Sequence, residues 1–103
     1  MKHYNYFVQR GYIVCNQESL PKITPKQVFQ KRFTDELYIN IIAYNPACTP
    51  DGVVRYEIEF QFHKDIAMSV IIFTLFEHDI IERLPRIEQY IIRLYNAFLQ
   101  EQL

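Results

Sequence analysis

Hydrophobic and polar residues alternate strictly from Val54 to His63. The apolar positions are Val54, Tyr56, Ile58, Phe60 and Phe62, and the polar positions are Arg55, Glu57, Glu59, Gln61 and His63. A period of two residues places the two sets on opposite faces of a strand. We therefore predict a strand with one buried face and one polar face.

The next segment, Ile66 to Phe76, loses this alternation. Only Ser69 and Thr74 interrupt its run of apolar residues. A strand of this composition requires cover on both faces. Because so short a chain offers one long helix as cover, we expect another molecule to cover the second face. The alternative is that the segment Pro25 to Phe33, or the first strand, covers it.

A further strand is predicted from Leu37 to Tyr44, where apolar residues again recur at every second position. The prolines and the glycine in residues 45–52 indicate a turn that joins the two alternating strands as a hairpin. Matching the apolar faces predicts three opposed pairs, namely Leu37 with Phe60, Ile39 with Ile58, and Ile41 with Tyr56.

Two segments near the N-terminus are also expected to be regular. Tyr4 to Val14 is rich in aromatic and β-branched residues, which predicts a strand with a bulge or bend at Gly11. Thr24 followed by Pro25 is typical of a helix start. We therefore predict a short helix from Pro25 to Phe33.

From Asp79 onward the hydrophobic period becomes helical. The apolar stripe consists of Ile80, Leu84, Ile87, Ile91, Leu94 and Phe98. A proline inside a helix costs about 3 kcal/mol. We therefore expect one short turn from Asp79 to Leu84, followed by a long helix that begins at Pro85.

These elements follow the order β-α-β-β-β-α within a single domain, residues 1–103. The sequence predicts the α+β class, with an antiparallel sheet of three or four strands and the long C-terminal helix packed on one face. Short connections between consecutive strands favour a meander. The pairing of the first strand stays open.

Composition and charge exclude several classes of protein. Half of the 103 residues are apolar and 16% are aromatic, which indicates an ordered core. Eleven basic and twelve acidic residues give a net charge of −1, so no overall field attracts polyanions. The longest apolar stretch, about 11 residues, is shorter than the roughly 20 that span a membrane. Cys15 and Cys48 form no metal-ligand pattern and are expected to be free thiols, with a disulfide between them as the alternative. We therefore expect a cytoplasmic protein.

The chain carries no motif of nucleophilic catalysis and no glycine-rich phosphate loop. We therefore expect no enzymatic activity and no cofactor. One alternative is a small metal-dependent hydrolase with Asp51, Glu57 and Glu59 as carboxylate ligands. Glu59, however, stands where such sites place a catalytic lysine.

A second alternative is a nucleic-acid-binding module that uses the basic segment Lys22 to Arg32. Its lysines and its arginine are interleaved with Phe29 and Phe33, and such a mixture suits phosphate contacts and base stacking. Acidic residues on both sides of the segment favour an ordinary solvated surface.

The outer face of the sheet is the main functional candidate. A two-residue turn at Lys64-Asp65 would direct outward Met68, Val70, Ile72, Thr74 and Phe76, and a shift by one residue would direct outward Ala67, Ser69, Ile71, Phe73 and Leu75. Either set is apolar, and an apolar surface with an acidic rim is typical of a protein-protein contact.

We therefore predict a small protein-protein interaction protein of adaptor, inhibitor or immunity type. It is expected to self-associate as a homodimer through the sheet or to bind another protein, and nucleic acid and membranes are not expected partners. The predicted interface consists of Tyr38, Ile42, Glu57, Glu59, Met68, Val70 and Ile72.

Overall fold

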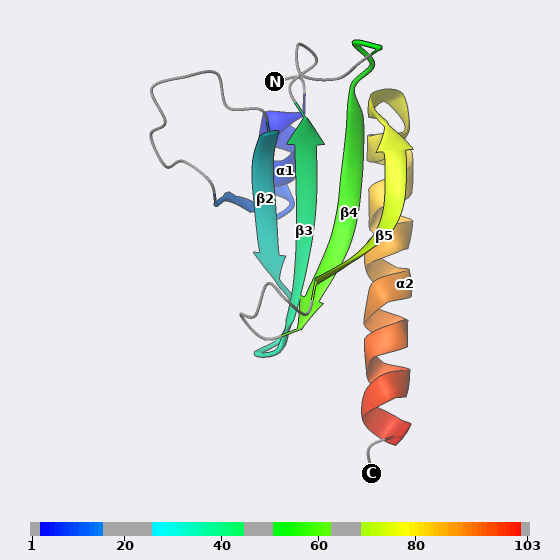
Figure 1. Ribbon diagram of the computed structural model, residues 1–103. Coiled ribbons are helices and arrows are strands. Elements are labelled where there is room, and N and C mark those ends of the chain that lie inside the picture. The colour runs from blue at the N-terminus through cyan, green and yellow to red at the C-terminus, as the bar shows by residue number, and fades with distance from the viewer. Residues whose placement is uncertain (1–2, 16–25, 45–50, 63–68, 102–103) are drawn as a thin grey trace.

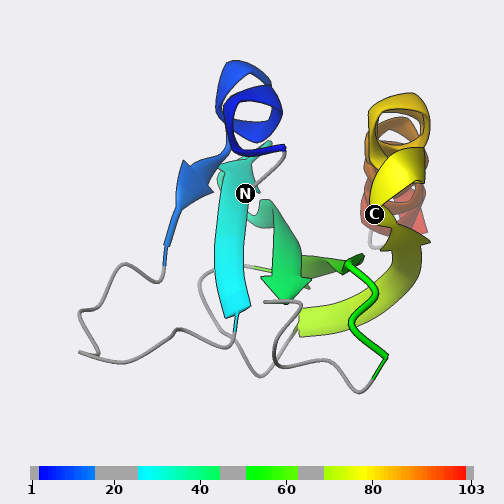
Figure 2. The same cartoon turned by 90° about the horizontal axis from the view of Figure 1, so that it is seen from above.

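In the described part of the chain, two α-helices cover the same face of a five-stranded antiparallel sheet (Figure 1, Figure 2). The computed structural model describes residues 3–15, 26–44, 51–62 and 69–101, with the backbone alone at positions 26, 62, 69–72 and 98. In chain order the elements are α1 (Tyr4–Gln9), β1 (Ile13–Val14), β2 (Lys26–Arg32), β3 (Leu37–Tyr44), β4 (Arg55–Phe62), β5 (Ser69–Phe76), the 3₁₀ turn η3 (Glu77–Asp79) and α2 (Ile80–Glu101).

The predicted α+β class and the C-terminal helix on one face are confirmed. The described sheet has five strands, however, and not three or four. Its strands follow one another in chain order with antiparallel neighbours throughout, which confirms the predicted meander. The differences from the predicted element order lie before residue 33.

The segment predicted as a first strand is instead helix α1, followed by the two-residue strand β1. Gly11, with φ of 94°, ends the helix in the left-handed region. Its N–H bonds the Val8 carbonyl, and the N–H of Tyr12 bonds the Phe7 carbonyl, each at 3.0 Å. This pair of bonds is the Schellman motif, which favours glycine. The strand-like composition was misleading because Phe7 packs against Phe29 at 4.9 Å between ring centres, and this tertiary contact outweighs weak local preference.

The segment predicted as a short helix is strand β2. All seven of its residues pair with β3, from Lys26 opposite Tyr44 to Arg32 opposite Tyr38. A helix cap contributes only about 1 kcal/mol. Pairing with β3 instead satisfies the backbone groups of every second residue along the segment and buries Phe29 completely.

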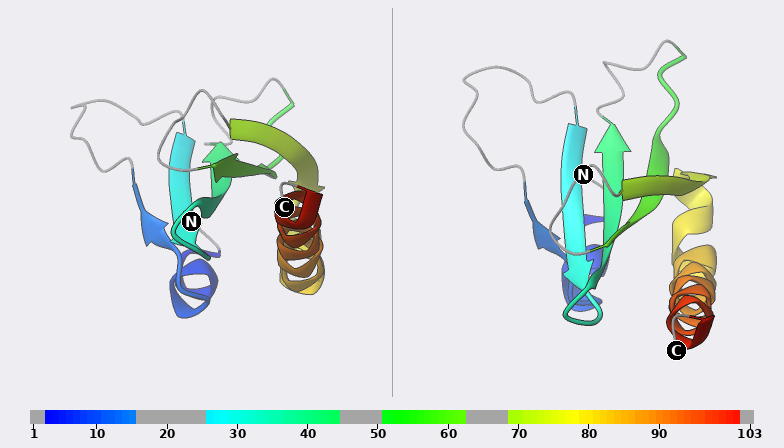
Figure 3. Two further views of the ribbon diagram at one scale, coloured as in Figure 1. Left: turned by 90° about the horizontal axis from the view of Figure 1, so that it is seen from below. Right: turned by 60° about the horizontal axis from the view of Figure 1, so that its bottom comes forward.

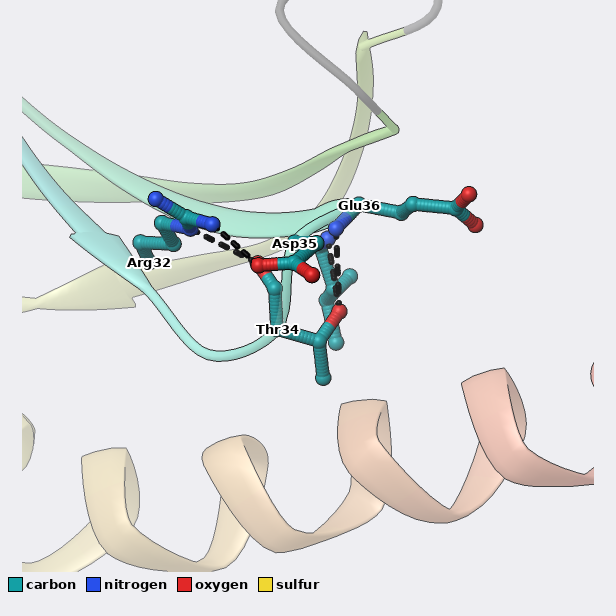
Figure 4. A network of polar contacts seen from close by, with 5 residues as sticks. Arg32, Thr34, Asp35 and Glu36 are labelled. Atoms are coloured by element: carbon teal, nitrogen blue, oxygen red, sulfur yellow. Dashed lines mark hydrogen bonds and ion pairs between the residues drawn. The ribbon is translucent and has the colours of Figure 1, made fainter.

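The loop between β2 and β3 holds its shape with its own side chains (Figure 4). The hydroxyl of Thr34 accepts bonds from the backbone N–H groups of Glu36 and Leu37, at 3.1 and 3.0 Å. Arg32 Nε donates to the Thr34 carbonyl at 3.2 Å. The hydroxyl of Tyr95 donates to the Glu36 carboxylate at 3.0 Å, and this bond connects the loop to α2.

The hairpin of β3 and β4 has the predicted faces but a different register. The observed pairs are Leu37 with Phe62, Ile39 with Phe60, and Ile41 with Ile58, each shifted by two residues from the prediction. A shift of two residues leaves every side chain on its face, so periodicity alone cannot distinguish the two registers. The face beneath the helices, which we call the helix face, is buried at Phe29, Leu37, Ile39, Ile41, Ala43, Tyr56 and Ile58.

A β-bulge interrupts the pairing of β4 with β5. Ile58 lies opposite Phe73 and Glu59 lies opposite Ile71, so Ile72 has no partner on β4. An extra residue on one strand bends it. The bend is visible in Figure 3, where β5 curves toward the start of α2.

This bulge explains why β5 lacks alternation. Ser69 and Thr74 are five residues apart, so a regular strand would place them on opposite faces. The extra residue places both positions on the face turned away from the helices. Each predicted register is therefore correct for half of the strand, one at Thr74 and Phe76 and the other at Ser69 and Ile71.

Helix α2 is continuous from Ile80 to Glu101, so the predicted break before Pro85 is wrong. A proline has no N–H, and the carbonyl four residues earlier, that of Ile81, therefore lacks its helical donor. The hydroxyl of Tyr6 donates to this carbonyl at 3.2 Å. A contact from α1 thus compensates for the proline.

The predicted apolar stripe of α2 is confirmed over most of its length. Its buried members are Ile80, Leu84, Ile87, Ile91 and Tyr95. Leu94 was predicted to belong to the stripe but is 44% exposed. Tyr95 takes the buried position instead, because its ring reaches the β2–β3 loop. The side chain of Phe98 lies outside the described residues.

Candidate interaction surface

A row of polar side chains crosses β2, β3 and β4 on the face turned away from the helices. Gln30 donates to the Asn40 side-chain oxygen at 2.8 Å, and Asn40 Nδ2 donates to Gln61 at 2.9 Å and to Glu59 at 3.0 Å. Asn40 and Gln61 are only 3% and 5% exposed, so these bonds satisfy buried amides. We call this side of the sheet the polar face, and the described side chains on it are Val28, Gln30, Arg32, Tyr38, Asn40, Ile42, Tyr44, Arg55, Glu57, Glu59, Gln61, Thr74 and Phe76.

Two carboxylates lie side by side within the polar face. Glu57 and Glu59 occupy alternate positions of β4, about 7 Å apart along the strand. The hydroxyl of Tyr44 is hydrogen-bonded to Glu57, and this bond together with burial raises the pKa of Tyr44 to about 12. Because Asn40 holds Glu59 in the same way, both negative charges are fixed in position.

The rim of the polar face carries an aromatic stack. The Arg55 guanidinium lies over the Phe76 ring at 5.4 Å, and the His78 ring is parallel to Phe76 at 5.8 Å. Arg55 also bonds both oxygens of Asp51, at 2.7 and 3.2 Å. This ion pair, followed by the N–H of Val53, lowers the pKa of Asp51. Phe76 remains 47% exposed.

The structure brings four of the predicted interface residues together on the polar face. Tyr38 and Ile42 on β3 are 6% and 7% exposed, so the chain itself already buries most of their surface. Glu57 and Glu59 on β4 are half-buried. The surface that a partner can reach therefore lies over β4 and β5 rather than over β3.

The other three predicted interface residues do not join this group. The position of Val70 lies opposite Phe60 and so belongs to the helix face. Ile72 is the unpaired residue of the bulge. Met68 lies outside the described residues. The apolar contribution predicted from β5 is thus reduced to the positions of Ile71 and Phe76.

The carboxylates proposed for a metal-dependent hydrolase are not gathered at one point. Asp51 faces Arg55, whereas Glu57 and Glu59 bond side chains of β3. Among the residues that the structure describes, no three His, Cys, Asp or Glu side chains could hold a metal ion together.

The basic segment is divided between the two faces of β2. Lys31 lies on the helix face, where its ammonium group is 4.8 Å from the centre of the Phe33 ring. Arg32 lies on the polar face and pairs with Asp35 (Figure 4). Lys22 lies outside the described residues. The described basic side chains therefore do not form one continuous patch.

A second polar cluster, which sequence reasoning missed, connects the two helices. The Arg10 guanidinium pairs with the Glu88 carboxylate, and the Tyr12 hydroxyl donates to the same carboxylate at 2.7 Å. Glu88 is only 3% exposed. Burial, and then the charge of Glu88, raise the pKa of Tyr12, and the bond to Glu88 raises the pKa of Arg10. Nearby, His3 Nδ1 and the Tyr56 hydroxyl are 2.9 Å apart.

One signal in the sequence could have revealed this cluster. Glu88 is four residues after Leu84 and three before Ile91, so it stands within the apolar stripe of α2. A charged residue at such a position requires a buried partner. The sequence did not indicate which residue that partner is, because Arg10 is 78 residues away.

Comparison of the chain with protein-family models, curated proteins and solved structures gives no match. Within the described residues, no helix has both the length and the apolar character required to cross a membrane. Cys15 is an exposed free thiol, and Cys48 lies outside the described residues. Function must therefore be argued from the geometry of the two polar clusters.

Proposed function

We propose that the chain is a non-catalytic protein-protein interaction protein, of adaptor, inhibitor or immunity type, whose polar face binds a basic surface of a partner protein. The observation that supports this proposal is the hydrogen-bonded row that holds Glu59, together with the Tyr44 bond that holds Glu57. Side chains that are already ordered lose little conformational entropy when a partner binds.

Charge selects the kind of partner. Glu57 and Glu59 give the exposed part of the polar face a negative excess, because the charge of Arg55 is offset by Asp51. Such a surface attracts lysine and arginine side chains and repels a second copy of itself. Phe76, which lies opposite Arg55 at the rim of the polar face and is 47% exposed, provides an aromatic anchor of the kind that dominates interface energies.

A selection of random peptides on the immobilised chain tests this proposal. We expect the retained peptides to be enriched in lysine and arginine, and their affinity to fall as salt is raised. Glu57→Gln and Glu59→Gln should each weaken binding about fivefold, because a charge-assisted hydrogen bond is lost. Phe76→Ala should also weaken binding.

Glu82→Gln is the matched control, because it removes one exposed carboxylate from α2 and leaves the polar face unchanged. It should bind the selected peptides like the unaltered chain. Peptides without basic residues, or equal losses in Glu57→Gln and Glu82→Gln, would contradict the proposal. Far-UV circular dichroism of each variant verifies that it is folded.

A further inference from the structure

Helix α2 has an apolar flank that the sheet covers only in part. Tyr90 and Leu94 are 49% and 44% exposed, which is high for large apolar side chains one helical turn apart. At 100° per residue they lie about 200° and 240° around the helix from Glu88, the residue that contacts α1. The Tyr90 ring also meets Phe73 of β5 edge-to-face at 6.0 Å. We call the side of α2 that carries Tyr90 and Leu94 the outer flank.

The outer flank borders the edge of the sheet. Among the described strands, β5 pairs with β4 alone, and its eight residues include no charged residue and no proline. In an antiparallel pair, every second residue of a strand bonds its neighbour through the backbone. The N–H of Glu77 bonds the Val54 carbonyl, so the backbone groups of Thr74 and Phe76 point away from β4. Natural proteins usually protect an edge of this length with charges. The contact between Phe73 and Tyr90 joins this strand to the outer flank.

Two charges on the outer flank are arranged symmetrically. Arg83 and Glu101 are 18 residues apart, which is five complete helical turns, so both lie on the same side of α2. Each is nine residues from Ile92, one before it and one after, and Tyr90 and Leu94 are each two residues from Ile92. Both charged side chains are exposed, and neither has an ion pair within the described residues.

We infer that the outer flank is a homodimer interface, in which a second copy of this chain packs antiparallel along α2 about a two-fold axis at the level of Ile92. In this arrangement Tyr90 contacts Leu94 of the second copy, and Arg83 pairs with Glu101 of the second copy at each end. A two-fold contact repeats every pair, so this ion pair forms twice in the dimer, once at each end of the interface.

This interface is separate from the polar face, which stays available to a partner protein. The inference therefore goes beyond the proposed function, and either can fail without the other. It also assigns self-association to a surface where the charges are complementary rather than to the acidic centre of the polar face.

Sedimentation analysis of charge variants tests the inference. The unaltered chain should sediment as a dimer at high micromolar concentration. Arg83→Glu and Glu101→Arg should each raise the dimer dissociation constant about tenfold, because two attractive pairs become repulsive. The double variant that carries both changes should dimerise like the unaltered chain, and Leu94→Arg should be a folded monomer.

Mixing the two single variants provides the sharpest result. A heterodimer of Arg83→Glu with Glu101→Arg contains an attractive pair at both ends, so the mixture should recover the dimer that each variant alone has lost. Glu82→Arg is the control, because this exposed residue lies about 100° around the helix from Glu101 and should not change the mass.

A monomeric unaltered chain, or a mixture that remains monomeric, would overturn the inference. So would single variants that dimerise as tightly as the unaltered chain. Glu57→Gln and Glu59→Gln should leave the dimer intact. If they alone abolish it, self-association uses the polar face and the outer flank is not the interface.

Discussion

The two faces of the sheet each hold a buried polar cluster, but the clusters differ in charge and in the distance they bridge. On the helix face, Glu88 is paired with Arg10, 78 residues away in the sequence. On the polar face, Asn40 bonds Gln30 and Gln61, which are 10 and 21 residues away on neighbouring strands. The first cluster joins two helices, whereas the second joins strands that the backbone already pairs.

This difference has an energetic consequence. A buried charge that loses its partner is strongly destabilising, because it cannot regain its hydration. A neutral amide that loses one bond has other acceptors within the row and a smaller desolvation penalty. We therefore expect the helix face to be sensitive to substitution and the polar face to be more tolerant, which agrees with a structural role for one and a binding role for the other.

The largest effect is expected in the apolar core of the helix face. Ile91 is 1% exposed, so Ile91→Ala should lower the free energy of unfolding by about 2–5 kcal/mol. Leu94→Ala, at a position that is 44% exposed, should cost less than about 1 kcal/mol when the chain is dilute enough to be monomeric. Urea denaturation measures both values. Equal losses would show that the outer flank is part of the core.

The next effect concerns the charged cluster. Glu88→Gln leaves the Arg10 guanidinium without its counterion and should cost about 2 kcal/mol. This is less than for a fully buried pair, because the Arg10 side chain is 30% exposed and can regain some water. Glu82→Gln, on the solvent side of the same helix, should change stability by no more than about 0.5 kcal/mol. A loss no greater than that of the control would mean that the cluster does not hold α1 in place.

The neutral row should be less sensitive. Asn40→Leu replaces a buried amide by an apolar group of similar size and should cost about 1 kcal/mol, because the existing bond between Gln30 and Gln61 at 3.4 Å remains and the half-buried Glu59 carboxylate can be hydrated in place of its bond to Asn40. Urea denaturation of Asn40→Leu beside Glu88→Gln gives the comparison directly. If Asn40→Leu is the more destabilising of the two, the contrast between the faces is wrong.

The smallest effect is a dependence of stability on alkaline pH. The folded chain raises the pKa of Tyr44 from 10.0 to about 12, so it holds a proton that the unfolded chain releases. The stability that Tyr44 contributes is therefore complete below pH 10 and declines as the pH rises toward 12. Unfolding free energies should fall less steeply with pH in Tyr44→Phe. Identical slopes in both proteins would show that the bond to Glu57 does not favour the protonated hydroxyl.

Part of the candidate surface could be read from the sequence. The alternation from Val54 to His63 correctly placed Glu57 and Glu59 on the face opposite the apolar residues, because a period of two is independent of register. The same reasoning could not place β5, since a single extra residue at Ile72 reverses the faces of half the strand. Composition contains no sign of where such an insertion falls.

In the N-terminal region, by contrast, the sequence predicted the wrong secondary structure. The signals in Tyr4 to Val14 and in Pro25 to Phe33 were local, and each indicated the wrong element. Phe7 and Phe29 determine which secondary structure each segment adopts, because their mutual contact and their contacts with the rest of the core bury them completely. Burial of two aromatic rings outweighs propensity differences that amount to less than about 1 kcal/mol per residue.

The sequence by itself determined the elements whose hydrophobic period is regular over many residues, namely β3, β4 and α2, and with them the α+β class. Tertiary structure alone decided the helix α1, the strand β2, the bulge in β5 and the partner of Glu88. The physical reason is distance along the chain. A period reflects one buried face and is visible locally, whereas the contacts of Tyr56 with His3 and of Glu88 with Arg10 join residues 53 and 78 positions apart and exist only after the chain has folded.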